Sequence, residues 1–442
     1  MCDHDTREDT NWQRLTTLSR FPSFIDAISE PVHRWYKYPA GFSPKAVEAA
    51  LTIYGVKEPE IVLDPFAGTG TTQIVCKLNG VLSLGLEAHP LTYEIACTKL
   101  EWNYTPAELQ SIDDLVQSLQ SIGRAHGDIV KELPKLLTDC YLHDDLVELL
   151  SLRDYISSCG YSDRVKKLVK LALLSILRKV AIAETGWSYV LPKRHKKRSG
   201  KSATQLLTAQ LESMKRDLLF VQNAHKRGDA KLFCADSRLD LMSILKDYRN
   251  HVDLTFTSPP YLNNYDYADR ARLEMYFLEM ASCWSDVTTC ARKPLVVSCT
   301  TQVSRTERQI IDILGSEIMR PLPASFEIAA ICARLTRARR RPNGKLGKSY
   351  DVVVARYFED MARVFKGLRA LHKKNSKMIM ILGDSAPYGV YIDTPTILGR
   401  IAVEMGFPRF NTVTLRTRGN KWTSNGRRHL VPLCEKLLII DG

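Results

Sequence analysis

The sequence lacks several features that mark common protein classes. None of the apolar runs among its 442 residues reaches about 18, so we expect no membrane span. The N-terminus, Met1 to Asp5, has neither the basic nor the apolar region of a signal peptide, which favours a cytoplasmic location. Eleven cysteines are scattered without a Cys-x-x-Cys pair. That pattern favours free thiols in a reducing cytoplasm over disulfides or a metal site.

Some familiar site signatures are also absent. The stretch with Gly68 and Gly70 lacks the third glycine of a dinucleotide fingerprint, and no Gly-Lys-Ser/Thr of a P-loop follows it. No Gly-x-Ser-x-Gly elbow surrounds Ser258, so its context does not mark it as a nucleophile. Neither a dinucleotide-dependent oxidoreductase nor a P-loop nucleotide hydrolase is therefore indicated.

Basic residues outnumber acidic ones. Lys and Arg total 62 and Asp and Glu total 49, which gives a formal net charge of +13. Such an excess favours a polyanionic partner, although it also occurs on proteins that simply stay in solution. The hydrophobic content of 45% is ordinary for a globular protein, and the length permits one large domain or two to three smaller ones.

The first informative stretch reads as a strand, a glycine-rich turn and a helix. An apolar run at 61–63 leads into Asp64-Pro65-Phe66-Ala67-Gly68-Thr69-Gly70, and a helical pattern follows to Leu78. This order is typical of the first unit of a doubly wound α/β sheet. A second strand at 81–86 ends on Glu87, about 20 residues after Asp64, where such folds place a carboxylate for ribose hydroxyls.

A second informative stretch is Thr257-Ser258-Pro259-Pro260-Tyr261, which follows a β-prone run at 252–256. Two adjacent prolines cannot donate backbone hydrogen bonds, so the strand must end there in a rigid loop. Fixed carbonyls, a hydroxyl and an aromatic ring at a strand end would suit a planar amino group. The alternative is a proline-terminated strand beside a core tyrosine.

The remaining pattern divides the chain into three parts. Residues 31–104 and 231–442 have α/β character, and 105–230 read as a helical insert. A short strand ends at Asp236, helices are expected over 45–54, 272–284, 350–371 and 394–405, and a strand over 377–382. Two closing strands, 409–415 and 433–440, have no helix between them, which predicts an antiparallel hairpin at a sheet edge.

Two basic segments stand out, at 193–201 and at 334–348, the second inside a polar insert at 286–349. Such runs contact phosphates or remain solvated loops. The candidates for nucleic-acid contact are Arg194, Lys196, Lys197, Arg198, Arg337, Arg339, Arg340, Arg341 and Lys345.

Together these motifs resemble the S-adenosylmethionine-dependent amino-methyltransferases that act on DNA in restriction–modification systems, in their cytosine-N4 form. The cofactor motif of that family, Asp-Pro-Phe-x-Gly-x-Gly, matches residues 64–70, and its Ser-Pro-Pro-Tyr motif matches 258–261. The resemblance covers roughly 33–104, 230–285 and 350–440 and leaves the two inserts uncovered. It implies a Rossmann-like class I methyltransferase fold with a mostly parallel sheet, and double-stranded DNA as partner.

The resemblance also implies roles for individual residues. S-adenosylmethionine would be held by the glycine loop, the helix start, two strand-end carboxylates and the aromatic block before the loop, that is by Tyr38, Phe42, Asp64, Phe66, Gly68, Gly70, Thr71, Thr72, Glu87 and Asp236. Ser258 and the Pro259 carbonyl would accept hydrogen bonds from the target amine, beside Pro260. Tyr261 would stack on a base rotated out of the duplex.

Several alternatives stay open at this point. Adenine-N6 relatives usually carry Asp or Asn where Ser258 stands. Cytosine is therefore the preferred target base, although this preference rests on one residue. An RNA base-amine methyltransferase shares the fold and a Pro-Pro-Tyr/Phe loop, and a nucleic-acid-binding protein with a degenerate methyltransferase core is a third reading. Carbon-5 chemistry is disfavoured because no Pro-Cys pair occurs. The sequence does not give the recognition site, the recognition segment, the oligomeric state or a separate partner endonuclease.

Overall fold

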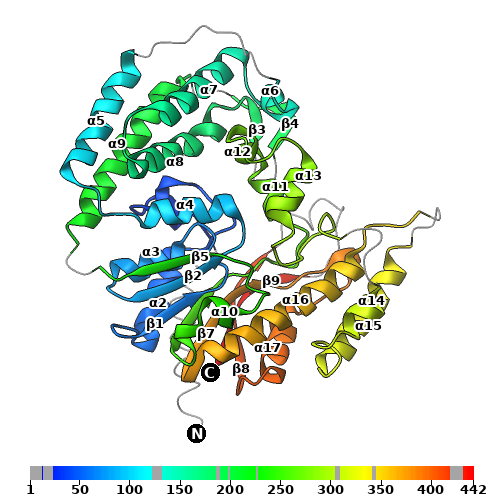
Figure 1. Cartoon of the computed structure of the whole chain (residues 1–442). Helices are drawn as coiled ribbons and strands as arrows, with labels where there is room; N and C mark the ends of the chain where they lie inside the picture. Colours follow the sequence, from blue (N-terminus) through cyan, green and yellow to red (C-terminus); the bar gives the residue numbers. More distant parts are fainter. Residues whose placement is uncertain are drawn as a thin grey trace.

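The computed structural model describes residues 12, 23–121, 132–185, 190–197, 200–224, 227–303, 309–340, 345–418 and 432–442. Within these residues the chain forms a seven-stranded sheet, helices on both of its faces and a helical region to one side (Figure 1). None of the described helices combines the length and the apolarity that crossing a bilayer would need.

The sheet has the strand order β5-β2-β1-β6-β7-β9-β8. All strands run parallel except β9, which pairs antiparallel with both β7 and β8. This confirms the expected Rossmann-like fold and the antiparallel edge hairpin. The strands are β1 (Ile61–Asp64), β2 (Leu82–Glu87), β5 (Ala230–Cys234), β6 (Val252–Thr257), β7 (His372–Gly383), β8 (Phe410–Arg418) and β9 (Leu433–Asp441).

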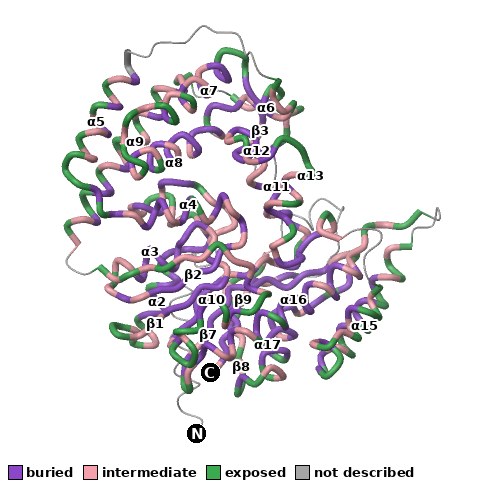
Figure 2. Tube along the Cα trace, viewed as in Figure 1, coloured by how far each residue is buried: buried purple, intermediate pink, exposed green. Residues whose placement is uncertain are grey.

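The central strand β1 shows why the sheet is covered on both faces. Val62 belongs to the core beneath α2 and α3, whereas its neighbour Leu63 belongs to the core beneath α16 and α17. Successive side chains of a strand point to opposite faces, so an unbroken apolar run requires helices on both sides. The covering helices are α2 (Pro44–Tyr54), α3 (Thr71–Leu78), α10 (Leu241–Ile244), α16 (Tyr350–Leu371) and α17 (Thr394–Glu404). Figure 2 shows the inner strands and α16 as mostly buried, whereas the edge strands β5 and β8 are more exposed.

The described residues of 105–230 form five helices and a short hairpin. The helices are α5 (Pro106–Ser121), α6 (Lys135–Cys140), α7 (His143–Ser158), α8 (Asp163–Val180) and α9 (Ala203–Gln222), and the hairpin is β3 (Ala183–Thr185) with β4 (Val190–His195). Their apolar faces form one core that also includes α4 (Pro90–Leu100) of the sheet region. The insert is therefore packed against the α/β region through α4.

One local expectation was wrong. The helix expected over 272–284 is interrupted between α12 (Arg272–Phe277) and α13 (Trp284–Val287), where Glu279 takes a left-handed backbone with φ of 58°. A short helix, α11 (Tyr267–Arg270), precedes α12. The first residues of the basic segment 334–348 belong to α15 (Ala324–Ala338), which follows α14 (Ile310–Leu314). Likewise β4 includes the first residues of the basic segment at 193–201.

Candidate functional site

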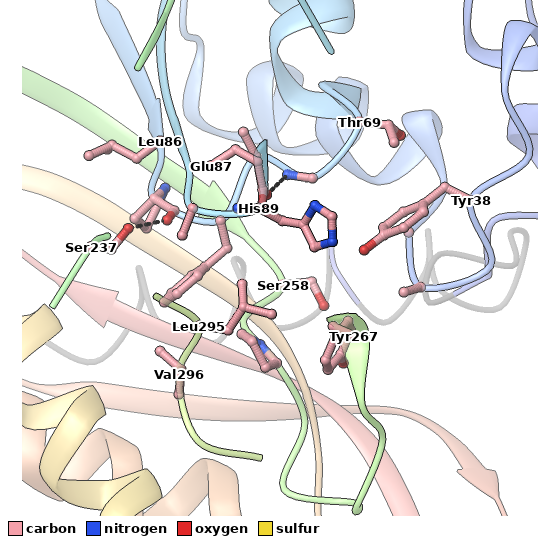
Figure 3. A pocket seen from close by; sticks show the side chains of 18 of the residues that line it. Tyr38, Thr69, Leu86, Glu87, His89, Ser237, Ser258, Tyr267, Leu295 and Val296 are labelled. Atoms are coloured by element: carbon pink, nitrogen blue, oxygen red, sulfur yellow. Dashed lines mark hydrogen bonds between the residues drawn. The ribbon is translucent and has the colours of Figure 1, made fainter. Parts of the chain in front are cut away.

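A cavity lies at the carboxyl ends of β1, β2, β5 and β6, where the strand order reverses between β1 and β6. Ligands of open α/β sheets bind at such a switch point. The cavity holds about 770 Å³ of empty space, including solvent at its mouth. Figure 3 shows its labelled side chains around one space. Its wall consists of Tyr38, Ala40, Gly41, Phe42, Pro65, Phe66, Ala67, Gly68, Thr69, Thr71, Leu86, Glu87, Ala88, His89, Asp236, Ser237, Ser258, Pro260, Tyr267, Pro294, Leu295 and Val296.

Asp64 lies beneath the glycine loop and outside this wall. Its carboxylate is fully buried and accepts hydrogen bonds from the Phe66 N–H (3.0 Å), the Thr72 hydroxyl (2.7 Å) and the Thr257 hydroxyl (2.6 Å). Burial raises the pKa of Asp64 to about 6, although the three hydrogen bonds favour the ionised form and oppose this rise. Asp64 thus joins β1 to α3 and β6. Asp64, Gly70 and Thr72 do not belong to the wall of the cavity, and their contact with the cofactor stays a prediction.

The two glycines of the loop have different surroundings. Both adopt positive φ, 55° at Gly68 and 83° at Gly70, which side-chain-bearing residues rarely take. Gly70 packs against α4, where an added Cβ would lie 3.4 Å from the Cβ of Ala96. Gly68 faces the cavity, and its N–H donates to Glu87 (2.8 Å). Gly68 therefore shapes the wall, whereas Gly70 brings α3 and α4 together.

Glu87 ends β2 with its carboxylate in the wall. One oxygen accepts from the Gly68 N–H and the other from the His89 N–H (2.7 Å), so each keeps capacity for a further donor. Burial raises the pKa of Glu87 to about 7. A carboxylate held in this way is suited to accept hydrogen bonds from a diol, as the sequence predicts for ribose. Asp236 also lies in the wall, and Arg238 donates to both of its oxygens (2.7–3.1 Å).

Ser258 lies in the wall at the end of β6. Its hydroxyl donates to the Ile381 carbonyl at 3.1 Å and also forms a hydrogen bond with the Tyr261 side chain, so the proton is engaged and one lone pair remains to accept. Pro260 lines the cavity too, but Pro259 and Tyr261 do not. Tyr261 packs on the core beneath α2, with the Arg418 guanidinium 5.7 Å from its ring centroid.

Some wall residues were missed by sequence reasoning. His89 is 3% exposed, its Nε2 has no partner among the described residues, and burial lowers its pKa to about 4. Ser237 donates to the Pro65 carbonyl, and the Tyr267 hydroxyl accepts from the Tyr261 N–H at 3.2 Å. His89 lies two residues after the end of β2, a signal that could have found it. Leu295 and Val296 gave no such signal, because they come from the insert at 286–349.

The basic candidates fall into two groups. Arg194, Lys197, Arg337, Arg340 and Lys345 are exposed. Lys196 donates to the Arg178 carbonyl and Arg339 pairs with Asp351 at 2.8 Å, so both have partners within the protein, and their phosphate contacts stay predictions. Arg198 and Arg341 lie outside the described residues.

Comparisons with known proteins agree with this geometry. A family model described as DNA methylase, of the N6/N4 type, matches residues 8–97. The type II methyltransferase M.BsoBI of Geobacillus stearothermophilus is 24% identical, with 93% of this chain and 86% of that protein aligned. M.AvaI of Anabaena variabilis is 27% identical, with 94% and 88% aligned. The rRNA methyltransferase aviRa of Streptomyces viridochromogenes aligns over 96% of this chain and 94% of its own, with 10% identity and a TM-score of 0.28, too low to support a structural argument.

The strand order and the cavity define a Rossmann-like methyltransferase. The family model and the two relatives, aligned over nearly the whole chain, support a restriction–modification DNA methyltransferase of the N4/N6 type. S-adenosylmethionine is the methyl donor that this class implies. The wall fits it, since Glu87 offers acceptors for hydroxyls and the unpartnered Nε2 of buried His89 offers a further polar contact.

Proposed function

We propose that this protein transfers a methyl group from S-adenosylmethionine to the exocyclic N4 amine of a cytosine within a specific sequence of duplex DNA. The observation that carries the proposal is the placement of Ser258. Its hydroxyl lies in the wall of the same cavity as Glu87 and the glycine loop, and its only proton is directed to the Ile381 carbonyl. Ser258 is therefore prepared to accept a hydrogen bond from an amine.

The chemistry requires such an acceptor. The lone pair of an exocyclic amine is delocalised into the ring, which makes the amine a poor nucleophile. Hydrogen bonds from the amine to Ser258 and to the Pro259 carbonyl would favour a pyramidal nitrogen and localise that lone pair. When bound, S-adenosylmethionine supplies an electrophilic methyl group, and a fixed orientation of the amine toward it accounts for much of the acceleration. No covalent adduct between protein and base is needed.

The cofactor is proposed to lie along the wall from Phe66 and Gly68 to Glu87 and Asp236, with Tyr38 and Phe42 covering it and Thr71 at the start of α3. Burial keeps His89 neutral, because its pKa falls to about 4. Its Nδ1 accepts from the Thr92 N–H at 3.5 Å, so the proton of the neutral ring is on Nε2 and can be donated to an uncharged acceptor of the cofactor.

DNA contact is proposed through the exposed basic residues that the fold leaves without strong protein partners. Arg194 and Lys197 lie at the end of the β3–β4 hairpin, and Arg337 and Arg340 lie at the end of α15. Figure 1 shows that these two segments belong to different parts of the molecule, the helical insert and the α14–α15 region. Both are proposed to contact phosphates. The target cytosine must leave the stack, and Tyr261 is the proposed stacking partner.

The test is incubation of the purified protein with tritiated S-adenosylmethionine and unmethylated genomic DNA, followed by digestion to nucleosides and mass spectrometry. Label in N4-methylcytosine is the expected result. Label in N6-methyladenine would retain the cofactor site and overturn the choice of base. Absence of label in DNA, with label in a matched RNA sample, would overturn DNA as the substrate.

A further inference from the structure

A second, smaller cavity adjoins the first behind Tyr38. It holds about 400 Å³ of empty space, including solvent at its mouth, and shares Tyr38, Gly41, Phe42, Thr69 and Thr71 with the wall of the cofactor cavity. The shared residues include Thr69 of the glycine loop and Thr71 at the start of α3. The remaining lining residues are Phe24, Ala27, Ile28, His33, Arg34, Tyr36, Lys37 and Lys99.

Lys99 is the unusual residue of this second cavity. It lies in the last turn of α4 and is 1% exposed. No carboxylate among the described residues pairs with its ammonium group, and burial lowers the pKa of Lys99 to about 7. Burying a lysine without an acidic partner is costly, so buried lysines normally have one. The cavity beside Lys99 offers space for a partner that is not part of the described chain.

His33 adds a second nitrogen group to the same cavity. It is 4% exposed, and its Nδ1 has no hydrogen-bond partner among the described residues. Burial and the nearby charge of Lys99 lower the pKa of His33. Arg34 also lines the cavity, but it pairs with Asp217. Lys99 and His33 thus form a cationic and hydrogen-bonding end that is complementary to a small anion.

We propose that Lys99, assisted by His33, pairs with the α-carboxylate of the methionine part of S-adenosylmethionine. This inference rests on the proposed function, because it takes the first cavity to hold the adenosine part. Glu87 lines only the first cavity and Lys99 only the second, so the acidic residue would face the sugar and Lys99 the amino acid. Neither Lys99 nor His33 belongs to the Asp64–Gly70 motif. They are positioning residues for the methyl donor.

The test compares two ligands that differ at the amino acid part. S-adenosylhomocysteine carries the carboxylate, whereas 5′-methylthioadenosine lacks it. Binding of each is measured by calorimetry with the wild-type protein and with Lys99→Met, which keeps the apolar chain and removes the charge. We expect Lys99→Met to weaken the binding of S-adenosylhomocysteine about 10- to 100-fold, which is the effect of losing one hydrogen bond to a charged group. Binding of 5′-methylthioadenosine should change less than about twofold.

Lys77→Met is the matched control. Lys77 is a partly buried lysine on α3 that donates to the Leu100 carbonyl at 2.7 Å and lines neither cavity. The Lys77→Met variant should leave the ratio of the affinities for S-adenosylhomocysteine and 5′-methylthioadenosine unchanged. If Lys99→Met does not fold, His33→Asn with the same ligand pair replaces it, with a smaller selective loss expected.

Each result has a defined meaning. Equal weakening of both ligands would show a structural role for Lys99 and overturn the inference, and so would no weakening of either. If the wild-type protein binds neither ligand, the proposed function itself fails. If the wild-type protein binds both and the variants behave as it does, only the carboxylate site fails.

Discussion

The cofactor cavity and the basic segments differ in how the fold holds their side chains. In the cavity, Glu87 is buried, and its oxygens accept hydrogen bonds from backbone N–H groups. On the β3–β4 hairpin, Arg194 is 73% exposed, and its nearest carboxylate, that of Glu184, lies 4.0 Å away. Buried bonds in a low dielectric are strong and mutually dependent, whereas exposed charges act weakly and nearly independently. Single substitutions should therefore have large effects in the cavity and small ones on the segments.

The largest effect is expected for Ser258→Ala. This variant should lower the rate of methyl transfer by about 100-fold or more, because removal of one preorganised hydrogen-bonding group at a reacting atom typically costs that much in rate. Cofactor binding should change less than about twofold. Tritium transfer to DNA and calorimetry measure the two quantities. Ser83→Ala, which removes a buried hydroxyl of β2 outside the cavity, is the control. Loss of cofactor binding in Ser258→Ala would contradict the proposed role.

The next effect concerns Asp64, which supports the cavity without lining it. Asp64→Ala leaves the Phe66 N–H and the Thr257 hydroxyl without the carboxylate that accepts from them, and it leaves the Thr72 hydroxyl only the more distant Phe256 carbonyl at 3.3 Å. We expect a loss of about 2–4 kcal/mol in the free energy of unfolding, measured with urea. Asp240→Ala, at the exposed N-cap of α10, should lose only about 1 kcal/mol. Equal losses in the two variants would contradict the assigned role of Asp64.

A smaller effect is expected for the pH dependence that Glu87 imposes. Its pKa is raised to about 7, so the ionised form that accepts two hydroxyls is complete above that pH and lost below it. The affinity for 5′-methylthioadenosine should fall about tenfold from pH 8 to pH 6. Glu87→Gln should bind more weakly and lose this dependence.

The choice of ligand matters in this experiment. S-adenosylhomocysteine would add the opposite dependence of Lys99, whose pKa is also about 7 and whose charged form is lost above it. A wild-type profile that is flat for 5′-methylthioadenosine between pH 6 and pH 8 would count against Glu87 as the acceptor of the ribose hydroxyls.

The smallest effect is expected on the basic segments. The double variant Arg194→Gln, Lys197→Gln should weaken DNA binding a few-fold and reduce the salt slope of log K by about 2, one for each phosphate contact. Fluorescence anisotropy over a range of salt concentrations measures this. Lys45→Gln, at an exposed position of α2, is the control. An unchanged slope in the double variant would remove the β3–β4 hairpin from the proposed DNA surface.

Much of the fold could be predicted because its signals are local. The apolar run before Asp64, the positive-φ glycines after it and the two prolines after Ser258 each restrict the backbone through neighbouring residues. The order of these units along the chain then predicts a parallel sheet. The break at Glu279 was missed, because helical periodicity continues through it and only the surrounding packing ends the helix.

The roles within the site depended on contacts between distant parts of the chain. The sequence by itself determined which strand ends carry Glu87, Asp236 and Ser258, since polar residues after apolar strands need only local patterning. Tertiary structure alone decided that Asp64 turns away from the cavity and that Lys99 and His33 meet behind Tyr38. Burial and partner choice are set by packing between elements far apart in the sequence. No local pattern records whether a charged side chain will find its partner within the fold.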